Sequence, residues 1–317
     1  YFAGIAGLLF YNMGSGILRA VGDSRHPFYY LLVSAISNII LDLLVVFVFH
    51  MGVSGVALAT VIAQLLSAVL TLITLFRTDT SVKVTLQDMK MDWTALKYIL
   101  IIGCPAAIQM ALTSFSNVFV QSYIAGVNGD QTAILGGWTS YSKIDQFLFL
   151  PSQSLALSIT TFVGQNLGAR NVARARRGIR LGILLAAAVT APIILLVMAF
   201  APSLAAIFNP DPGVVECATL LLHYLTPFYM FTCVNQLLAS GLRGAGNSTA
   251  PMVIMLVSFV GFRQLYLFVM STYISNDLLP VAMGYPAGWA LCCLVISLYY
   301  VLHKFHLPEE IQTEETL

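Results

Sequence analysis

Nine apolar runs divide the chain, and each is long enough to cross a bilayer core, which takes about 20 residues of α-helix. Breaker clusters such as GDSRHP, GVNGD and FNPDPG separate the runs. Only 9% of the 317 residues are charged, whereas a soluble domain carries about 25%. The sequence therefore predicts an all-α, polytopic membrane helix bundle. The expected spans are residues 1–18, 28–48, 53–76, 97–125, 132–159, 178–200, 215–241, 250–273 and 284–303.

Lysine and arginine occupy alternate connections between these runs. The basic connections contain Arg19 and Arg25, then Arg77, Lys83 and Lys90, then the cluster from Arg170 to Arg180, then Arg243 and finally Lys304. The other connections hold no Lys or Arg. Because basic loops stay on the cytoplasmic side, we expect a plasma (inner) membrane protein with these loops and the C-terminus in the cytoplasm. A net charge of +1 gives no reason to expect nucleic acid.

Two stretches of the chain repeat each other. LRAVGDSRHPFYYLLVS, from Leu18, matches LRGAGNSTAPMVIMLVS, from Leu242, at an offset of 224, and MGVSGVAL from Met51 is echoed by MGYPAGWAL from Met283. Both copies of the first motif follow a span on the basic side, which indicates parallel repeats. In each copy we expect the glycine to end a helix or turn the chain, and the Asp or Asn to close an Asx turn or cap the next helix.

The repeat divides the chain into a first lobe with three spans and a second lobe with six. We predict residues 1–76 as the remainder of the N-terminal lobe, 77–96 as a cytoplasmic linker that is partly an amphipathic surface helix, 97–304 as the C-terminal lobe and 305–317 as a cytoplasmic tail. If the lobes match, roughly 125 residues, or three spans, precede this chain in an intact twelve-span protein.

At GILRAVGDSRHP, SNIILDLL, MGVSGVALATVIAQ, GCPAAIQ, KIDQFLFLPSQSLALSITTFVGQNLGARN and GLRGAGNSTAP, the chain resembles the multidrug and toxic compound extrusion (MATE) family. These pieces follow the family's order and cover nearly the whole chain. The resemblance implies two six-helix lobes around a central cavity. It also implies alternating access, with export of organic compounds driven by entry of H+ or Na+.

Asp42 is an ionisable group within an apolar run, which costs roughly 2.5–3.5 kcal/mol on insertion scales and marks a candidate site. Asn38 lies one turn earlier on the same helix face. Asp42 and Thr60 are equally far in sequence from the turn at Met51, so we expect them at similar depth. Their oxygens suit Na+, and a desolvated carboxylate suits H+. The alternative is a buried Asp satisfied by neighbouring hydroxyls.

The resemblance implies that Asn38, Asp42 and Thr60 match the family's N-lobe cation site, which also uses an Asp from the family's first helix. The family's other acidic site lies on the first and fourth helices of the C-lobe. The matching spans here hold no embedded Asp or Glu, so we expect the coupling ion in the N-lobe.

Polar residues in the second lobe are candidates for a substrate cavity. On a helical wheel Lys143 and Asp145 point in different directions, with Tyr141 on the Asp145 side. Arg263 lies at mid-span and is a possible ion-pair partner for Asp145, either structurally or as part of a cavity-facing relay. The uncharged candidates serve equally well as interhelical hydrogen bonds. The candidate cavity residues are Gln109, Tyr141, Lys143, Asp145, Asn235 and Arg263.

Other functions fit less well. GVSG, from Gly52, resembles an intramembrane serine-protease motif, but all five histidines lie near span ends and the repeated copy lacks the serine. A lipid-linked saccharide flippase of related two-lobe architecture remains the alternative, although it would need more cations than Lys143 and Arg263; a channel fits a single acidic site less well than a carrier does. We expect no enzyme and no cofactor, but a monomeric exporter of cationic or neutral amphipathic compounds in contact with membrane lipids.

Overall fold

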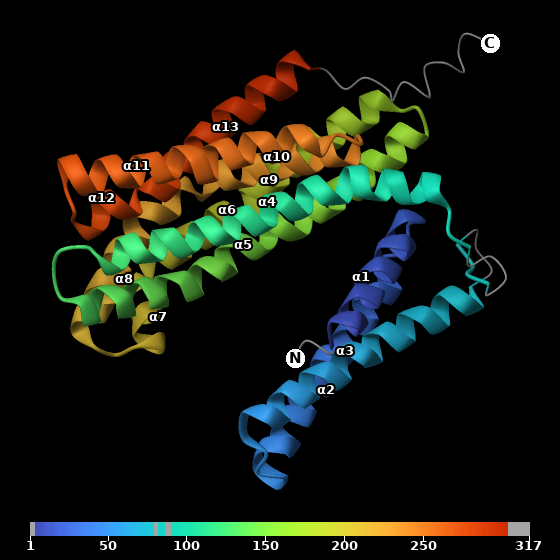
Figure 1. Cartoon of the computed structure of the whole chain (residues 1–317), viewed down its shortest axis with the longest axis horizontal. Helices are drawn as coiled ribbons and strands as arrows, with labels where there is room; N and C mark the ends of the chain where they lie inside the picture. The colour runs from blue at the N-terminus through green and yellow to red at the C-terminus, as the bar shows by residue number, and fades with distance from the viewer. Residues whose placement is uncertain (1–3, 79–81, 86–89, 304–317) are drawn as a thin grey trace. The chain divides into compact units, whose positions relative to one another are not determined.

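The computed structural model describes residues 4–78, 82–85 and 90–303, and the elements it contains there are helices. The chain divides into two compact units, Tyr1–Asp92 and Trp93–Leu317, here called unit 1 and unit 2 (Figure 1). Each unit is described by itself. The division falls within the segment predicted as a linker between the lobes.

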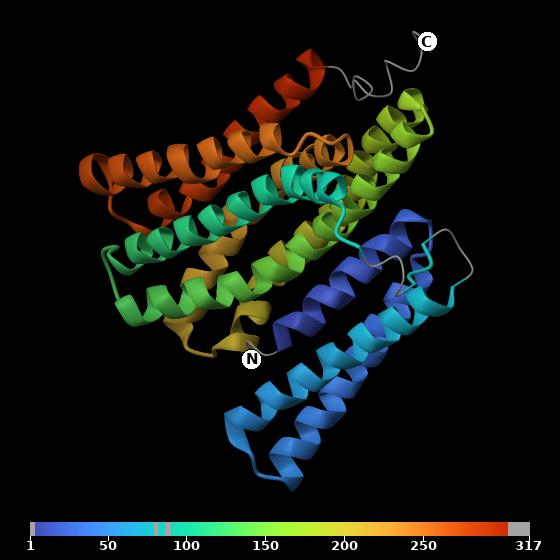
Figure 2. The same cartoon turned by 45° about the vertical axis from the view of Figure 1, so that its right-hand side comes forward.

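Unit 1 contains three long helices, with α3 packed against both of the others (Figure 2). Small residues allow the close approach of α1, since a Cβ atom on Gly14 would lie 2.4 Å from the Thr71 side chain. Hydroxyls join α2 to α3, with Ser34 Oγ donating to the Ala63 carbonyl at 2.6 Å and Tyr30 bonded to Thr74. The elements are α1 (Ile5–Ala20), α2 (Arg25–Leu43), the π-helix η2 (Leu44–Val48) and α3 (Gly52–Arg77).

Unit 2 is built around α5, which packs against α6, α8 and α9 (Figure 1). A bilayer core accepts only about 20 residues of helix. Helix α5 has 38 residues, so it exceeds this length more than any other helix in the described residues. The elements are α4 (Trp93–Ala125), α5 (Gln131–Gly168), α6 (Val172–Ala199), α7 (Ala201–Phe208), α8 (Pro212–Leu225), η3 (Thr226–Phe228), α9 (Tyr229–Gly244), α10 (Thr249–Leu256), η4 (Val257–Phe262), α11 (Arg263–Val269), η5 (Met270–Ile274), α12 (Leu278–Ala282) and α13 (Gly284–Leu302).

Eight continuous helical segments in the described residues are long and apolar enough to cross a membrane, and they match the last eight predicted spans. The first predicted span corresponds to α1, whose 16 residues fall short of that length. Two details were not predicted. Pro227 interrupts the seventh span with the 3-10 turn η3, and the short helix α7 follows α6.

The segment predicted as a linker, 77–96, is shorter in the structure. Helix α3 includes Arg77, and α4 already begins at Trp93. Residues 82–85 are not helical, and the Val84 amide donates to the Leu75 carbonyl at 3.0 Å. The amphipathic helix expected there is therefore absent from the described part of the segment. Residues 79–81 and 86–89 of the linker and the predicted tail, 305–317, lie outside the described residues.

The repeated motif forms the same hairpin in both units. Gly22 and Gly246 follow the first helix with φ values of +90° and +84°, which a residue with a side chain rarely adopts. Asp23 and Asn247 then accept backbone N–H groups at the start of the next helix. The predicted helix ends are confirmed, and Asp23 and Asn247 satisfy N–H groups of the next helix from one residue before its N-caps, Ser24 and Ser248. This geometry depends only on a short stretch of sequence.

Candidate functional sites

Asn38 and Asp42 lie on the face of α2 that packs against α3. Their helical spacing aligns them with Ser34, which bonds to α3, and with Val45, which covers Gly55 of α3. Both side chains are half-buried. The Asn38 Nδ2 atom and the Asp42 Oδ1 atom are fully buried and have no hydrogen-bond partner among the described residues. The alternative of a carboxylate fully satisfied by neighbouring hydroxyls is therefore wrong for this oxygen.

Thr60 lies on α3 in the same helix pair, at a different level from the one predicted. Ser34 lies against Ala63, and Val45 against Gly55. This register places Thr60 level with Asn38, so Asp42 is offset from it by up to one turn. The prediction assumed the same rise per residue on both sides of Met51. The π-helix η2 and the turn at His50 both lie on the α2 side, so equal numbers of residues cover different distances along the two helices.

The three residues offer oxygen ligands with unused capacity. The Thr60 hydroxyl donates to the Val56 carbonyl at 3.0 Å, which leaves its oxygen lone pairs available. A buried polar atom without a partner costs about 1–3 kcal/mol. The described residues contain no group of three His, Cys, Asp or Glu side chains placed to hold a metal ion. An ion here would therefore be held by a mixture of carboxylate, hydroxyl and amide oxygens.

Unit 2 encloses a separate cavity of about 310 Å³. It opens among α4, α5, α9, α13 and the segment from α10 to α11. Three predicted cavity residues, Gln109, Asp145 and Arg263, line it. Its full lining is Gln109, Met110, Thr113, Ser114, Asn117, Asp145, Phe149, Gln153, Tyr229, Thr232, Gln236, Met255, Phe259, Arg263, Tyr285 and Trp289.

Arg263 is one of the two charged residues that line this cavity, and its exposed fraction is 3%. Its Nη2 atom donates to Ser116 Oγ and to Asn117 Oδ1, both at 2.8 Å. Its guanidinium carbon lies 4.7 Å from the centre of the Tyr285 ring, within cation–π range. The Nε atom is buried without a partner among the described residues.

Asp145 lines the same cavity but does not pair with Arg263. Its Oδ1 atom accepts a hydrogen bond from the Tyr141 hydroxyl at 3.0 Å, which confirms that these two residues share a face of α5. Among the described residues, no ion pair joins Asp145 to Arg263. The hypothesis of an Asp145–Arg263 ion pair is therefore wrong, because uncharged groups on α4 hold the guanidinium instead.

The other predicted cavity residues, Tyr141, Lys143 and Asn235, do not line this cavity. Lys143 is exposed and borders a different surface pocket with Thr139 and Phe208. Asn235 is buried and donates to the Trp289 carbonyl at 3.0 Å, so it joins α9 to α13 rather than facing the cavity. Gln109 does line the cavity, but its amide already accepts from Arg243 at 2.6 Å and donates to Met255 Sδ at 2.8 Å.

The aromatic wall of the cavity was missed in the sequence. Tyr285 and Trp289 lie one turn apart on α13, with ring centres 5.9 Å apart, and Trp289 also meets Tyr229 edge to face at 5.1 Å. The available signal was the second copy of the short repeat, where MGYPAGWAL has aromatic residues at the places of Val53 and Val56 in MGVSGVAL.

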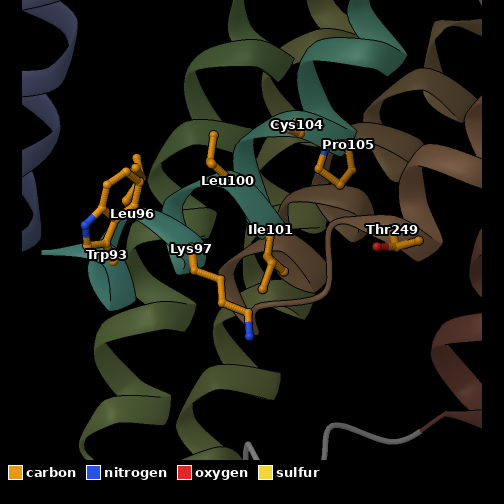
Figure 3. Close-up of a pocket in the computed structure, with 8 residues that line it drawn as sticks. All are labelled: Trp93, Leu96, Lys97, Leu100, Ile101, Cys104, Pro105 and Thr249. Atoms are coloured by element: carbon orange, nitrogen blue, oxygen red, sulfur yellow. The ribbon is translucent and has the colours of Figure 1, made fainter.

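A larger hollow of about 540 Å³ lies near the start of α4 (Figure 3). Trp93, Leu100, Ile101 and Pro105 make it mainly apolar, and Thr249 borders it from α10. Lys97 is the one charged residue in its lining. It contains none of the candidate site residues, and its mainly apolar lining gives no reason to expect chemistry there.

A family model described as MatE matches residues 105–269, which is more than half of the chain. The chain belongs to the MatE family. This match covers most of unit 2, including Asp145 and Arg263. The resemblance seen in the sequence motifs is thereby confirmed, and so is the multi-pass membrane character that the helices indicate.

Curated relatives are named for multidrug resistance or for transport. The probable multidrug resistance protein YoeA of Bacillus subtilis is 29% identical over 313 residues, covering 94% of this chain and 67% of its own length. The probable multidrug resistance protein NorM of Thermotoga maritima is 28% identical and is covered over 58% of its length. A FAD transporter of Shewanella oneidensis is 25% identical and is covered over 70%. The chain thus spans about two thirds of the length of such relatives.

Solved MATE structures share the fold. An outward-facing multidrug resistance MATE transporter superposes with a TM-score of 0.89 at 23% identity, over 95% of this chain and 67% of that one. A MATE structure in a bent conformation gives a TM-score of 0.86 at 24% identity, over 95% and 66%. At this identity the likeness shows the fold alone.

Proposed function

We propose that this protein is a secondary antiporter, which exports organic compounds across the plasma membrane in exchange for H+ or Na+. Membership of the MatE family and the multidrug names of its relatives support export. The same names favour an exporter over the lipid-linked saccharide flippase. The basic loops support a cytoplasmic location for the α1–α2 and α9–α10 connections.

The observation that carries the coupling role is the unpartnered Oδ1 atom of Asp42. A buried carboxylate oxygen without a partner is unfavourable unless a proton or a cation occupies it for part of the cycle. Asn38 and Thr60 supply further oxygens on the facing surfaces of α2 and α3. Binding of the cation here would stabilise one state of the first lobe, and its release would allow the return step.

The substrate is an organic compound whose class the relatives do not fix. Two of the three relatives described above are named for multidrug resistance, and one is named for FAD transport. The polar and aromatic cavity in unit 2 supports contact with such compounds.

The test uses the full-length protein in proteoliposomes, with export of an ethidium-type dye followed under an imposed pH or Na+ gradient. We expect Asp42→Asn to reduce export to the rate seen without a gradient, because an amide neither titrates nor neutralises a cation. Asp277→Asn is the matched control, since this carboxylate is exposed and bonds only to Ser275 nearby. Gradient-driven export at the wild-type rate in Asp42→Asn would remove Asp42 from coupling.

Thr60→Ala and Asn38→Ala separate the two coupling ions. If Na+ is the ion, each change should weaken the dependence on a Na+ gradient, because both residues supply oxygen ligands. If H+ is the ion, the dependence on the pH gradient should persist in both variants.

A further inference from the structure

Arg263 is a buried cation without a carboxylate partner in the described part of the chain. Its contacts are a hydroxyl, an amide oxygen and an aromatic ring, all of them uncharged. Buried charges in proteins are usually paired, because desolvation of an isolated ion is costly. The guanidinium borders an open cavity, so an anionic group of a bound molecule has access to it.

Asp145 presents the opposite charge to the same 310 Å³ space. Tyr141 donates to one of its oxygens, and no cation in the described residues lies within ion-pair distance. The two charges therefore share a cavity without neutralising each other by direct contact. A purely anionic molecule would meet repulsion from Asp145, and a purely cationic one from Arg263. A molecule with separated charges satisfies both groups.

Flat apolar surfaces lie beside these charges. The Tyr285 ring packs under the Arg263 guanidinium, and Trp289 extends the same wall along α13. Phe149 and Phe259 add further aromatic surface from α5 and η4. Aromatic walls favour a planar molecule, and a volume of this size is at the lower end for small-molecule sites, about 300 Å³ and upward.

We propose that this cavity binds a planar, dipolar organic compound, with a carboxylate or phosphate group at Arg263 and an ammonium or N–H donor at Asp145. The proposal rests on the proposed function, since such a compound would be the exported substrate. It refines the expectation of cationic or neutral amphipathic compounds, because a bare organic cation leaves Arg263 without an anion.

The test measures binding to the detergent-purified full chain by titration calorimetry, without any ion gradient. Three probes share one biphenyl skeleton. The first carries an aminomethyl group at one end and a carboxylate at the other, the second replaces the carboxylate by its methyl ester, and the third replaces the aminomethyl group by methyl. We expect the first to bind about tenfold or more tightly than either of the others, because only it makes two charge-assisted contacts.

Two variants assign the contacts. Arg263→Gln should reduce the affinity for the dipolar probe to that for the ester and leave the affinity for the ester unchanged. Asp145→Asn should reduce the affinity for the dipolar probe to that for the methyl compound and leave the affinity for the methyl compound unchanged. Lys143→Gln is the matched control, because it removes a cation from α5 outside the cavity. Equal affinity of wild type for all three probes would overturn the proposal, and this comparison holds even if Arg263→Gln does not fold.

Binding and coupling can fail separately. Selective binding of the dipolar probe by a protein without gradient-driven export would contradict the antiporter proposal and support the cavity assignment. Gradient-driven export that depends on Asp42, together with equal binding of the three probes, would support the antiporter proposal and contradict the cavity assignment.

Discussion

The two copies of the repeated motif fold into similar hairpins, but the helices that follow carry residues of opposite charge. After Gly22 and after Gly246, the next amide bonds back to the leucine that begins the motif, at 2.9 Å in both hairpins. The π-helix η2 of unit 1 falls near the place of η5 in unit 2, whereas η4, which contains Ser258, has no π-helical counterpart around Ser34. The hairpins therefore match through the turn and into the start of the second helix.

Beyond those serines the copies diverge. At the same offset, the positions of Asn38 and Asp42 are taken by Phe262 and Tyr266, and Arg263 replaces Ile39. The Tyr266 hydroxyl is satisfied by the Pro280 carbonyl at 3.2 Å, whereas the Asp42 oxygen is unsatisfied. The same hairpin thus carries a carboxylate, Asp42, in unit 1 and a cation, Arg263, in unit 2. This difference supports a division between ion coupling in unit 1 and substrate contact in unit 2.

The largest expected difference between the copies is in coupling. Asp42→Asn should abolish the response of dye export to the gradient, as described above. Tyr266→Phe, at the repeat-equivalent position, should retain that response and change only the hydrogen bond to Pro280. Proteoliposome export with and without a gradient measures both, and loss of the response in Tyr266→Phe would mean that the roles are not divided in this way.

The second difference concerns packing at the short repeat. A Cβ atom on Gly55 would lie 1.9 Å from Val45 Cγ1, whereas one on the equivalent Gly288 would meet its nearest atom, the Ser258 carbonyl oxygen, at 3.2 Å. We expect Gly55→Ala to destabilise the protein by about 2 kcal/mol through overpacking. Gly288→Ala should stay within about 1 kcal/mol, because alanine also favours the helix.

Unfolding of both alanine variants, followed by denaturant in detergent, gives the comparison. A larger loss of stability in Gly288→Ala than in Gly55→Ala would contradict the tighter fit between α2 and α3.

A third prediction tests how Arg263 is held. Ser116 Oγ accepts both from Arg263 and from Gln264 Nε2, each at 2.8 Å. Ser116→Ala removes an acceptor from two donors, so we expect a loss of about 1–2 kcal/mol. The melting temperature in detergent measures it. Ser122→Ala is the control, because this serine is exposed on the same helix and bonds within α4, and it should leave the melting temperature almost unchanged. Equal melting temperatures for Ser116→Ala and Ser122→Ala would show that Arg263 finds other partners.

The smallest expected effect distinguishes Asp23 from Asn247 in the two hairpins. Burial raises the pKa of Asp23, but the hydrogen bonds and charge of His26, together with the Arg25 amide, outweigh it, and the pKa lies below its ordinary value of 3.8. A carboxyl with a lowered folded pKa stabilises the fold above its unfolded pKa, and this contribution is lost as the pH falls through the folded value.

Wild type should therefore lose a little more thermal stability than Asp23→Asn on acidification from about pH 5 to about pH 3. The Asn247 hairpin has Ala250 at the place of His26, so Asn247→Asp should add a smaller acid-dependent loss than Asp23 contributes. Parallel pH profiles of wild type and Asp23→Asn would show that the cap does not titrate.

Much of this architecture could be predicted from short stretches of sequence. The apolar runs predicted eight of the helices that the structure contains, and the repeat predicted two equal hairpins, because hydrophobic length and a glycine with positive φ act locally. The candidate pair Asn38 and Asp42 was found for the same reason, since four-residue spacing on one helix fixes a shared face.

The sequence by itself determined the helices, their repeat and which residues are costly to place in a membrane. The tertiary structure alone decided what those residues touch. Arg263 contacts Ser116 and Asn117, almost 150 positions earlier, and Tyr285 on another helix, while the ion pair with Asp145 does not form. Charge and hydrophobicity are properties of a residue and its neighbours in sequence. Burial and the choice of partner depend on how distant helices pack, and that information is spread over the whole unit.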